Sequence, residues 1–152
     1  MSRLDEMGSG SSFHRILVEA ERVAADDKMR RVVLCTGKVY FDLVKARAER
    51  SNDRVALVRV EQLYPFPFKT LSKVLQRYRN AEIVWCQEEP QNMGAWNFVD
   101  RRIEHVLAGL DVAAKRPRFA GRAEAASPAT GLFKRHVEEQ AHLVADALAA
   151  QA

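Results

Sequence analysis

Short apolar runs alternate with stretches of helical periodicity along the chain. Runs rich in β-branched residues predict strands at residues 30–35, 55–60, 82–86 and 116–122, with a further edge strand at 13–18. Between these runs, apolar residues recur every three or four positions and predict helices at 39–50, 69–79, about 92–109 and from 130 to the carboxyl end. Residues 19–28 are expected to form a loop or a weak helix. This order predicts an α/β fold, a three-layer helix–sheet–helix sandwich around a mostly parallel sheet of about five strands.

The distribution of polar residues divides the chain into a leader and a domain. Residues 1–28 are mostly polar and include a Gly-Ser stretch at residues 8–12, which predicts a leader and linker that carry the edge strand. Residues 29–152 supply the other strands and the helices of the sandwich. A chain of 152 residues with 47% hydrophobic and 29% charged residues fits one globular domain of this kind.

Charge and cysteine content exclude several classes of protein. The net charge of +4 is small and Lys and Arg are dispersed, so nucleic acid is not an expected partner. No apolar run approaches the roughly 20 residues of a membrane span, and the amino terminus lacks the apolar core of a signal peptide. Cys35 and Cys86 each end an apolar run without metal-ligand spacing, which predicts buried, reduced thiols in a cytoplasmic protein.

The turn between the strand at 30–35 and the following helix contains Thr36, Gly37 and Lys38. Thr36 can cap the helix, Gly37 allows a ligand to approach the backbone, and Lys38 adds a positive charge at the positive end of the helix dipole. These features predict a site for an anionic effector. A capped helix with an exposed lysine explains the same residues, and the long glycine-rich turn of a P-loop is missing.

Two further polar segments follow the next two strands. Their polar residues are Glu61, Gln62, Gln87, Glu88, Glu89 and Asn92. Because the carboxyl ends of parallel strands share one edge of a sheet, we expect these loops to lie along that edge with the Thr36–Lys38 turn. Three aromatic residues are candidates for an interface with a partner: Phe66, Phe68 and Trp96. The alternative is that all three belong to the core.

Residue patterns give no support for catalysis by this chain. It has no nucleophile elbow, no GxGxxG motif, no metal-ligand spacing and no Cys/His or His/Asp pair at a catalytic spacing. Helix charges such as Glu138 and Glu139 are expected to be solvated. We therefore expect no catalytic, cofactor-binding or metal-binding residue here. Residue chemistry alone predicts a binding or assembly domain whose carboxyl edge binds an anionic effector or a protein segment.

Long motifs of the chain resemble a known family. They are residues 35–43 (Cys-Thr-Gly-Lys-Val-Tyr-Phe-Asp-Leu), 59–67 (Arg-Val-Glu-Gln-Leu-Tyr-Pro-Phe-Pro), 82–96 (Glu-Ile-Val-Trp-Cys-Gln-Glu-Glu-Pro-Gln-Asn-Met-Gly-Ala-Trp), 118–121 and 126–131, with residues 6–15 leading into the domain. In order and over nearly the whole chain, they resemble the carboxyl-terminal, transketolase-type domain of the thiamine-diphosphate-dependent decarboxylating component of 2-oxoglutarate dehydrogenase.

The resemblance implies a transketolase C-terminal-like fold and a role in a larger enzyme of the tricarboxylic acid cycle. The complete component of that family decarboxylates 2-oxoglutarate on thiamine diphosphate with Mg²⁺. It then transfers the succinyl group to the lipoyl arm of a succinyltransferase component. That component is a homodimer to which this domain contributes. The implied partners are the missing amino-terminal part of the same component, the homodimer partner and the lipoyl succinyltransferase component.

The domains that hold the family's cofactor ligands and catalytic residues have no counterpart in this chain. The resemblance therefore implies a structural, dimerisation and effector-binding role, and no activity for the isolated chain. A truncated gene product, a split subunit and an excised domain all fit a sequence of this extent. A bacterial cytoplasmic location is expected rather than the mitochondrial matrix. The alternative is a free-standing anion- or protein-binding module that kept the fold. The Gln-Glu-Glu-Pro-Gln-Asn stretch disfavours other thiamine enzymes of the transketolase group.

Overall fold

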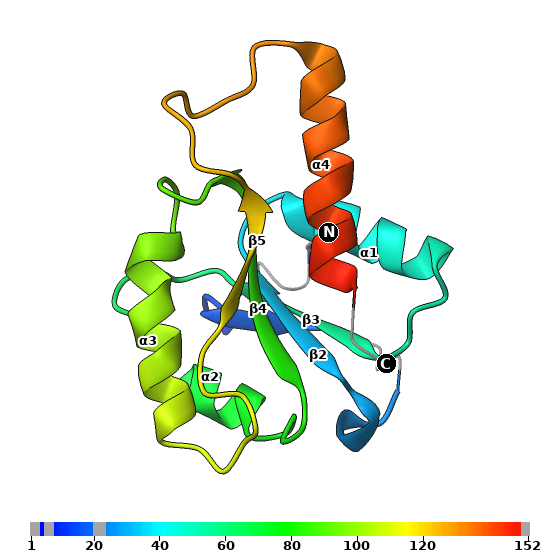
Figure 1. The fold of residues 1–152 in the computed structure, drawn as a ribbon. Helices are drawn as coiled ribbons and strands as arrows, with labels where there is room; N and C mark the ends of the chain where they lie inside the picture. Colours follow the sequence, from blue (N-terminus) through cyan, green and yellow to red (C-terminus); the bar gives the residue numbers. More distant parts are fainter. Residues whose placement is uncertain (1–3, 5–7, 20–23, 150–152) are drawn as a thin grey trace.

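The computed structural model describes residues 4, 8–19 and 24–149 and forms one sheet with helices on both faces (Figure 1). Its elements are β1 (Ile16–Val18), the 3₁₀ helix η2 (Asp26–Lys28), β2 (Arg31–Cys35), α1 (Val39–Glu49), β3 (Val55–Val60), α2 (Phe68–Leu75), β4 (Glu82–Pro90), α3 (Trp96–Ala108), β5 (Arg118–Arg122) and α4 (Phe133–Leu148). The loop or weak helix predicted at 19–28 contains η2, while its residues 20–23 lie outside the described residues.

The five strands of the sheet lie in the order β1-β3-β2-β4-β5. Neighbouring strands from β3 to β5 are parallel, and β1 pairs antiparallel with β3, with Ile16 opposite Val60 and Val18 opposite Val58. All five residues of the central strand β2 are buried, as expected for a parallel strand covered on both faces. The predicted mostly parallel sheet of about five strands is confirmed, and its antiparallel strand β1 lies at the edge, within the edge strand predicted at 13–18.

Two apolar cores attach the helices to the sheet. Val32 and Leu34 of β2 belong to the core that α2 and α3 cover, and Val33 and Cys35 belong to the core that α1 and α4 cover. The alternation follows from the two-residue period of a strand, which sends successive side chains to opposite faces. Figure 1 shows the two pairs of helices on opposite faces of the sheet. The predicted three-layer sandwich is confirmed.

Polar side chains near the amino ends of the strands cap the carboxyl end of α4. Arg31 donates from Nη1 to the carbonyl oxygens of Asp146 (2.8 Å) and Ala147 (3.0 Å), and Asn52 donates to that of Leu148 (3.0 Å). The last four carbonyl groups of a helix have no partner within the helix, and a guanidinium also complements the negative end of the helix dipole. These groups are therefore used to hold α4 on the sheet.

Strand β4 runs to Pro90, beyond the strand predicted at residues 82–86. The prediction that Gln87, Glu88 and Glu89 lie in a loop was therefore wrong, since all three belong to the strand. The register with β5 shifts in this stretch, because Cys86 pairs with Ala120 and Pro90 with Arg122, so that four positions along β4 correspond to two along β5. Because the ladder is irregular there, polar residues are accommodated inside a strand that the sequence pattern ends early.

Three helix ends also differ from the prediction. α2 ends at Leu75 rather than near residue 79, and α3 begins at Trp96 rather than near residue 92. The N-cap residue of α4 is Leu132, without a side-chain cap. The hydroxyl of Thr130, at the predicted start of this helix, donates to the carboxylate of Glu139. A contact with a distant side chain thus takes the place of a local cap.

Candidate functional site

An ion pair at the carboxyl edge of the sheet connects two of the predicted polar segments. Lys38 donates from Nζ to the carboxylate of Glu88, and this hydrogen bond raises the pKa of Lys38. Gln140 of α4 donates to the same carboxylate (3.1 Å) and to that of Asp42 on α1 (2.8 Å). The Lys38 side chain is 72% exposed and that of Glu88 is 25% exposed. α1, β4 and α4 are therefore joined by one polar cluster that solvent reaches from the lysine side.

The turn before α1 has part of the geometry expected for anion binding. Gly37 has a φ of +73°, a conformation that L side chains rarely adopt, and a Cβ there would meet nothing within 4 Å. The N-cap residue of α1 is Lys38, and no side chain caps this helix. The prediction that Thr36 caps it is therefore wrong. The first backbone N–H groups of α1 lack a side-chain acceptor at the cap, which is the feature an anion site uses.

Glu61 and Gln62, predicted for the same edge, have partners of their own. Oε1 of Glu61 lies 3.5 Å from Nε of Arg59 in an ion pair. The Gln62 amide nitrogen donates to the carbonyl oxygen of Pro65 (2.6 Å). These contacts hold the loop that follows β3. Neither contact involves Lys38 or Glu88. The polar segments predicted to lie together at the carboxyl edge of the sheet therefore come together only in part.

The side chain of Gln87 organises the turn between β4 and α3. Its amide oxygen accepts from Nε1 of Trp85 (3.0 Å) and from the backbone N–H of Trp96 (2.9 Å). Its amide nitrogen contacts three carbonyl oxygens, those of Glu89 (3.3 Å), Pro90 (3.2 Å) and Met93 (2.7 Å). The residue is 2% exposed. Because both ends of the amide are fully used, Gln87 supports the turn and has no free group for a ligand.

The segment after β5 is held by Arg122, which sequence reasoning did not single out. Its Nη1 donates to the hydroxyl of Thr130 (2.9 Å) and its Nη2 to the carbonyl oxygen of Pro128 (2.6 Å). Its Nε donates to the carbonyl oxygen of Glu88 (2.6 Å). One guanidinium therefore ties this segment to β4. An arginine ending a strand next to a Ser-Pro loop is too common a pattern to have signalled this role.

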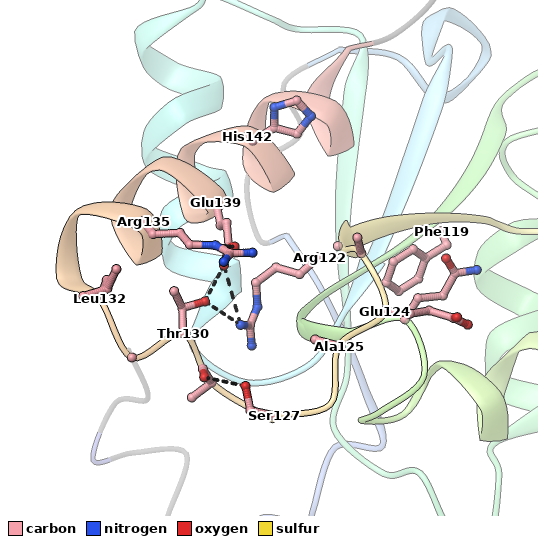
Figure 2. A pocket seen from close by; sticks show the side chains of 15 residues that line it. Phe119, Arg122, Glu124, Ala125, Ser127, Thr130, Leu132, Arg135, Glu139 and His142 are labelled. Atoms are coloured by element: carbon pink, nitrogen blue, oxygen red, sulfur yellow. Dashed lines mark hydrogen bonds and ion pairs between the residues drawn. The ribbon is translucent and has the colours of Figure 1, made fainter.

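Glu139 of α4 completes this polar group (Figure 2). Its carboxylate accepts from the hydroxyl of Thr130 and from Nε of Arg135 (2.7 Å), and these hydrogen bonds lower the pKa of Glu139. The expectation that Glu139 is a solvated helix charge was wrong. Beside this group lies a pocket of about 550 Å³, bounded by the segment after β5 and by α4. Asn92 fixes the outer part of that segment through two hydrogen bonds with the backbone of Ala125, at 3.0 and 3.2 Å.

The three aromatic interface candidates have different environments. Phe66 is 8% exposed and belongs to the core, whereas Phe68 is 40% exposed. The Phe68 ring contacts those of Phe66 and His105 edge-on, with centroids 5.0 and 5.6 Å apart. Trp96 is half-buried and its ring centroid lies 5.2 Å from that of Phe119. Among the three, Phe68 presents the most accessible ring to a partner.

Within the described parts of the chain, no three His, Cys, Asp or Glu side chains come together as a metal site. None of the helices described there is both long and apolar enough to cross a membrane.

The fold and the carboxyl edge of its sheet define a three-layer α/β domain. The polar side chains at that edge mainly hold the domain's own loops and helices together. Residues 1–148 match the profile of the family described as 2-oxoglutarate dehydrogenase C-terminal. Curated relatives from Brucella anthropi, Brucella ovis and Brucella melitensis, each called 2-oxoglutarate dehydrogenase E1 component, are 53% identical over 97% of this chain. The chain belongs to the 2-oxoglutarate dehydrogenase C-terminal family. It spans 16% of the length of these relatives. Nothing in the comparisons favours a free-standing binding module.

Proposed function

We propose that the chain serves as the carboxyl-terminal domain of the decarboxylating component of 2-oxoglutarate dehydrogenase. The identity of 53% over 97% of the chain with components of that name carries the proposal. The complete enzyme decarboxylates 2-oxoglutarate oxidatively and transfers the succinyl group to lipoyl groups. Its partners are the remainder of the component, a second copy in a homodimer and the lipoyl succinyltransferase component. The bacterial relatives support a cytoplasmic location.

Thiamine diphosphate and Mg²⁺ belong to the complete enzyme in this proposal. Among the described residues, no three His, Cys, Asp or Glu side chains come together that could hold the Mg²⁺. The proposal therefore assigns no catalytic step to the side chains of this chain. Its contribution is to give the component a rigid layered domain.

A chimera tests this function. The chain replaces the matching region of the Brucella anthropi component, and turnover of 2-oxoglutarate is measured with thiamine diphosphate, Mg²⁺ and an artificial electron acceptor. We expect turnover by the chimera and none by the isolated chain. An inactive chimera that is folded, or turnover by the isolated chain, would contradict the supporting role.

We also propose that Thr36, Gly37 and Lys38 bind an anionic effector. The exposure of Lys38 and the uncapped start of α1 support this site. An anion binding there competes with the Glu88 carboxylate for the lysine. Calorimetry with a nucleotide and with an acyl-coenzyme A tests it, using the chain and its Lys38→Ala variant. Binding that is lost in the variant supports the site, and absence of binding at millimolar ligand ends the small-molecule version of this proposal.

A further inference from the structure

The first half of α4 lies outside the sandwich. Figure 1 shows α4 extending past the carboxyl edge of the sheet, with only its second half over the strands. Residues 131–138 are all exposed, whereas Leu143, Val144, Ala147 and Leu148 are buried. Residues 133–138 therefore bury none of their side chains, although burial of an apolar face is what normally stabilises a helix of a globular protein.

Exposed apolar side chains concentrate on the same stretch. Leu132, Phe133 and Val137 are 72%, 81% and 48% exposed. Phe133 and Val137 are four residues apart, so they share one face of the helix. The other exposed large hydrophobic side chains among the described residues are scattered between residues 4 and 68. We refer to Leu132, Phe133 and Val137 as the α4 ridge.

A hollow borders the α4 ridge on each side. The pocket of about 550 Å³ next to the segment after β5 includes Leu132 in its wall (Figure 2). A groove of about 410 Å³ between α1 and α4 includes Phe133 and Val137. A partner that covers these apolar side chains also contacts the two hollows beside them. Exposed apolar clusters of this kind mark interaction sites.

We propose that the α4 ridge is the surface through which this domain packs against the remainder of the decarboxylating component. The inference rests on the proposed function. The chain covers 16% of the length of its relatives, so most of each relative is polypeptide outside this domain and is available to cover the ridge. The charges beside the ridge, Lys134, Arg135, Glu138 and Glu139, are balanced in sign. This balance favours an apolar protein surface over an anionic or cationic partner.

Hydrogen exchange of residues 131–138 tests the assignment in the chimera described above, with the isolated chain as reference. We expect these amides to exchange at least about tenfold more slowly in the chimera. A Phe133→Ser, Val137→Ser double variant should lose this protection while its isolated form keeps the melting temperature of the unmodified chain. The control is Tyr64→Ser, which removes an aromatic side chain that is 81% exposed, as that of Phe133 is. It should leave the protection of residues 131–138 unchanged.

The outcomes separate the two proposals. An active chimera whose residues 131–138 exchange as in the isolated chain overturns the surface assignment alone. An inactive chimera with protected residues 131–138 overturns the proposed function and keeps the surface, and an inactive chimera without protection overturns both. Protection in the isolated chain that rises with its concentration assigns the α4 ridge to a second copy and overturns the proposed partner.

Discussion

The carboxylate of Glu19 pairs with both terminal nitrogens of Arg47, although these side chains are only 15% and 9% exposed. The same carboxylate accepts from the backbone N–H of Leu57 (3.0 Å). β1 ends at Val18, opposite Val58, so Glu19 supplies the acceptor that β1 no longer provides to β3. The division into a leader at residues 1–28 and a domain at 29–152 stays a prediction. This contact connects the two parts.

Glu19→Ala should destabilise the protein by about 3 kcal/mol, because it leaves the Arg47 guanidinium buried without its counter-charge. The backbone N–H of Leu57 also loses its acceptor. Urea denaturation at neutral pH measures the free energy of unfolding. The control is Asp111→Ala, which removes an exposed ion pair with Arg79 (3.7 Å) and should change that free energy by less than about 0.5 kcal/mol. Equal losses in both variants would show that Glu19 is not needed for stability.

The layers of the fold could be predicted from the sequence because they depend on local apolar patterns. The run at 55–60 is nearly continuous in apolar residues, and β3 occupies that range. Buried parallel strands produce such runs whatever their partners are. The edge strand at 13–18 was also expected from its apolar residues, although β1 covers only Ile16–Val18.

The polar contacts of the site could not be predicted in the same way. Glu139 bonds Thr130, and Arg47 bonds Glu19, through geometry that only the folded chain creates. In the sequence, a helix charge that is paired in the folded chain cannot be distinguished from one that is solvated. Gln87 ended the predicted strand because its amide is polar, yet that amide is buried with all its groups bonded. Only the pair of Lys38 with Glu88 followed from the expectation that parallel strands share an edge.

Gly94→Ala should cost about 3 kcal/mol of stability, more than Gly37→Ala. Both glycines have positive φ, +65° and +73°, for which an L residue costs about 1–2 kcal/mol. At Gly94 a Cβ would also lie 2.9 Å from Nε2 of Gln87, so the amide must move from its carbonyl partners. A Cβ at Gly37 would meet nothing within 4 Å. Chemical denaturation of the two variants compares them, and equal losses would exclude a steric role for Gly94.

Glu139→Gln should destabilise the protein at neutral pH, and this difference should vanish in acid. Hydrogen bonds from Thr130 and Arg135 hold the pKa of Glu139 below its usual value of 4.5. A lowered folded-state pKa stabilises the fold above pH 4.5, and this contribution is lost as the pH falls below that value through the folded-state pKa. Denaturation over a series of pH values falling from about 7 measures how this difference declines. Glu138→Gln is the matched control at the exposed neighbour, and a difference for Glu139→Gln that persists in acid would contradict the role of its charge.

Neither cysteine should react with Ellman's reagent while the protein is folded. Cys35 and Cys86 lie opposite each other on β2 and β4, and both are fully buried. Burial raises the pKa of Cys86 to about 12 and raises that of Cys35 as well, so the reactive thiolate is scarce at about pH 8. Unfolding in guanidinium chloride should release both thiols to the reagent, which calibrates the assay. Prompt reaction of either thiol in protein with an unchanged circular dichroism spectrum would contradict the burial of the two thiols.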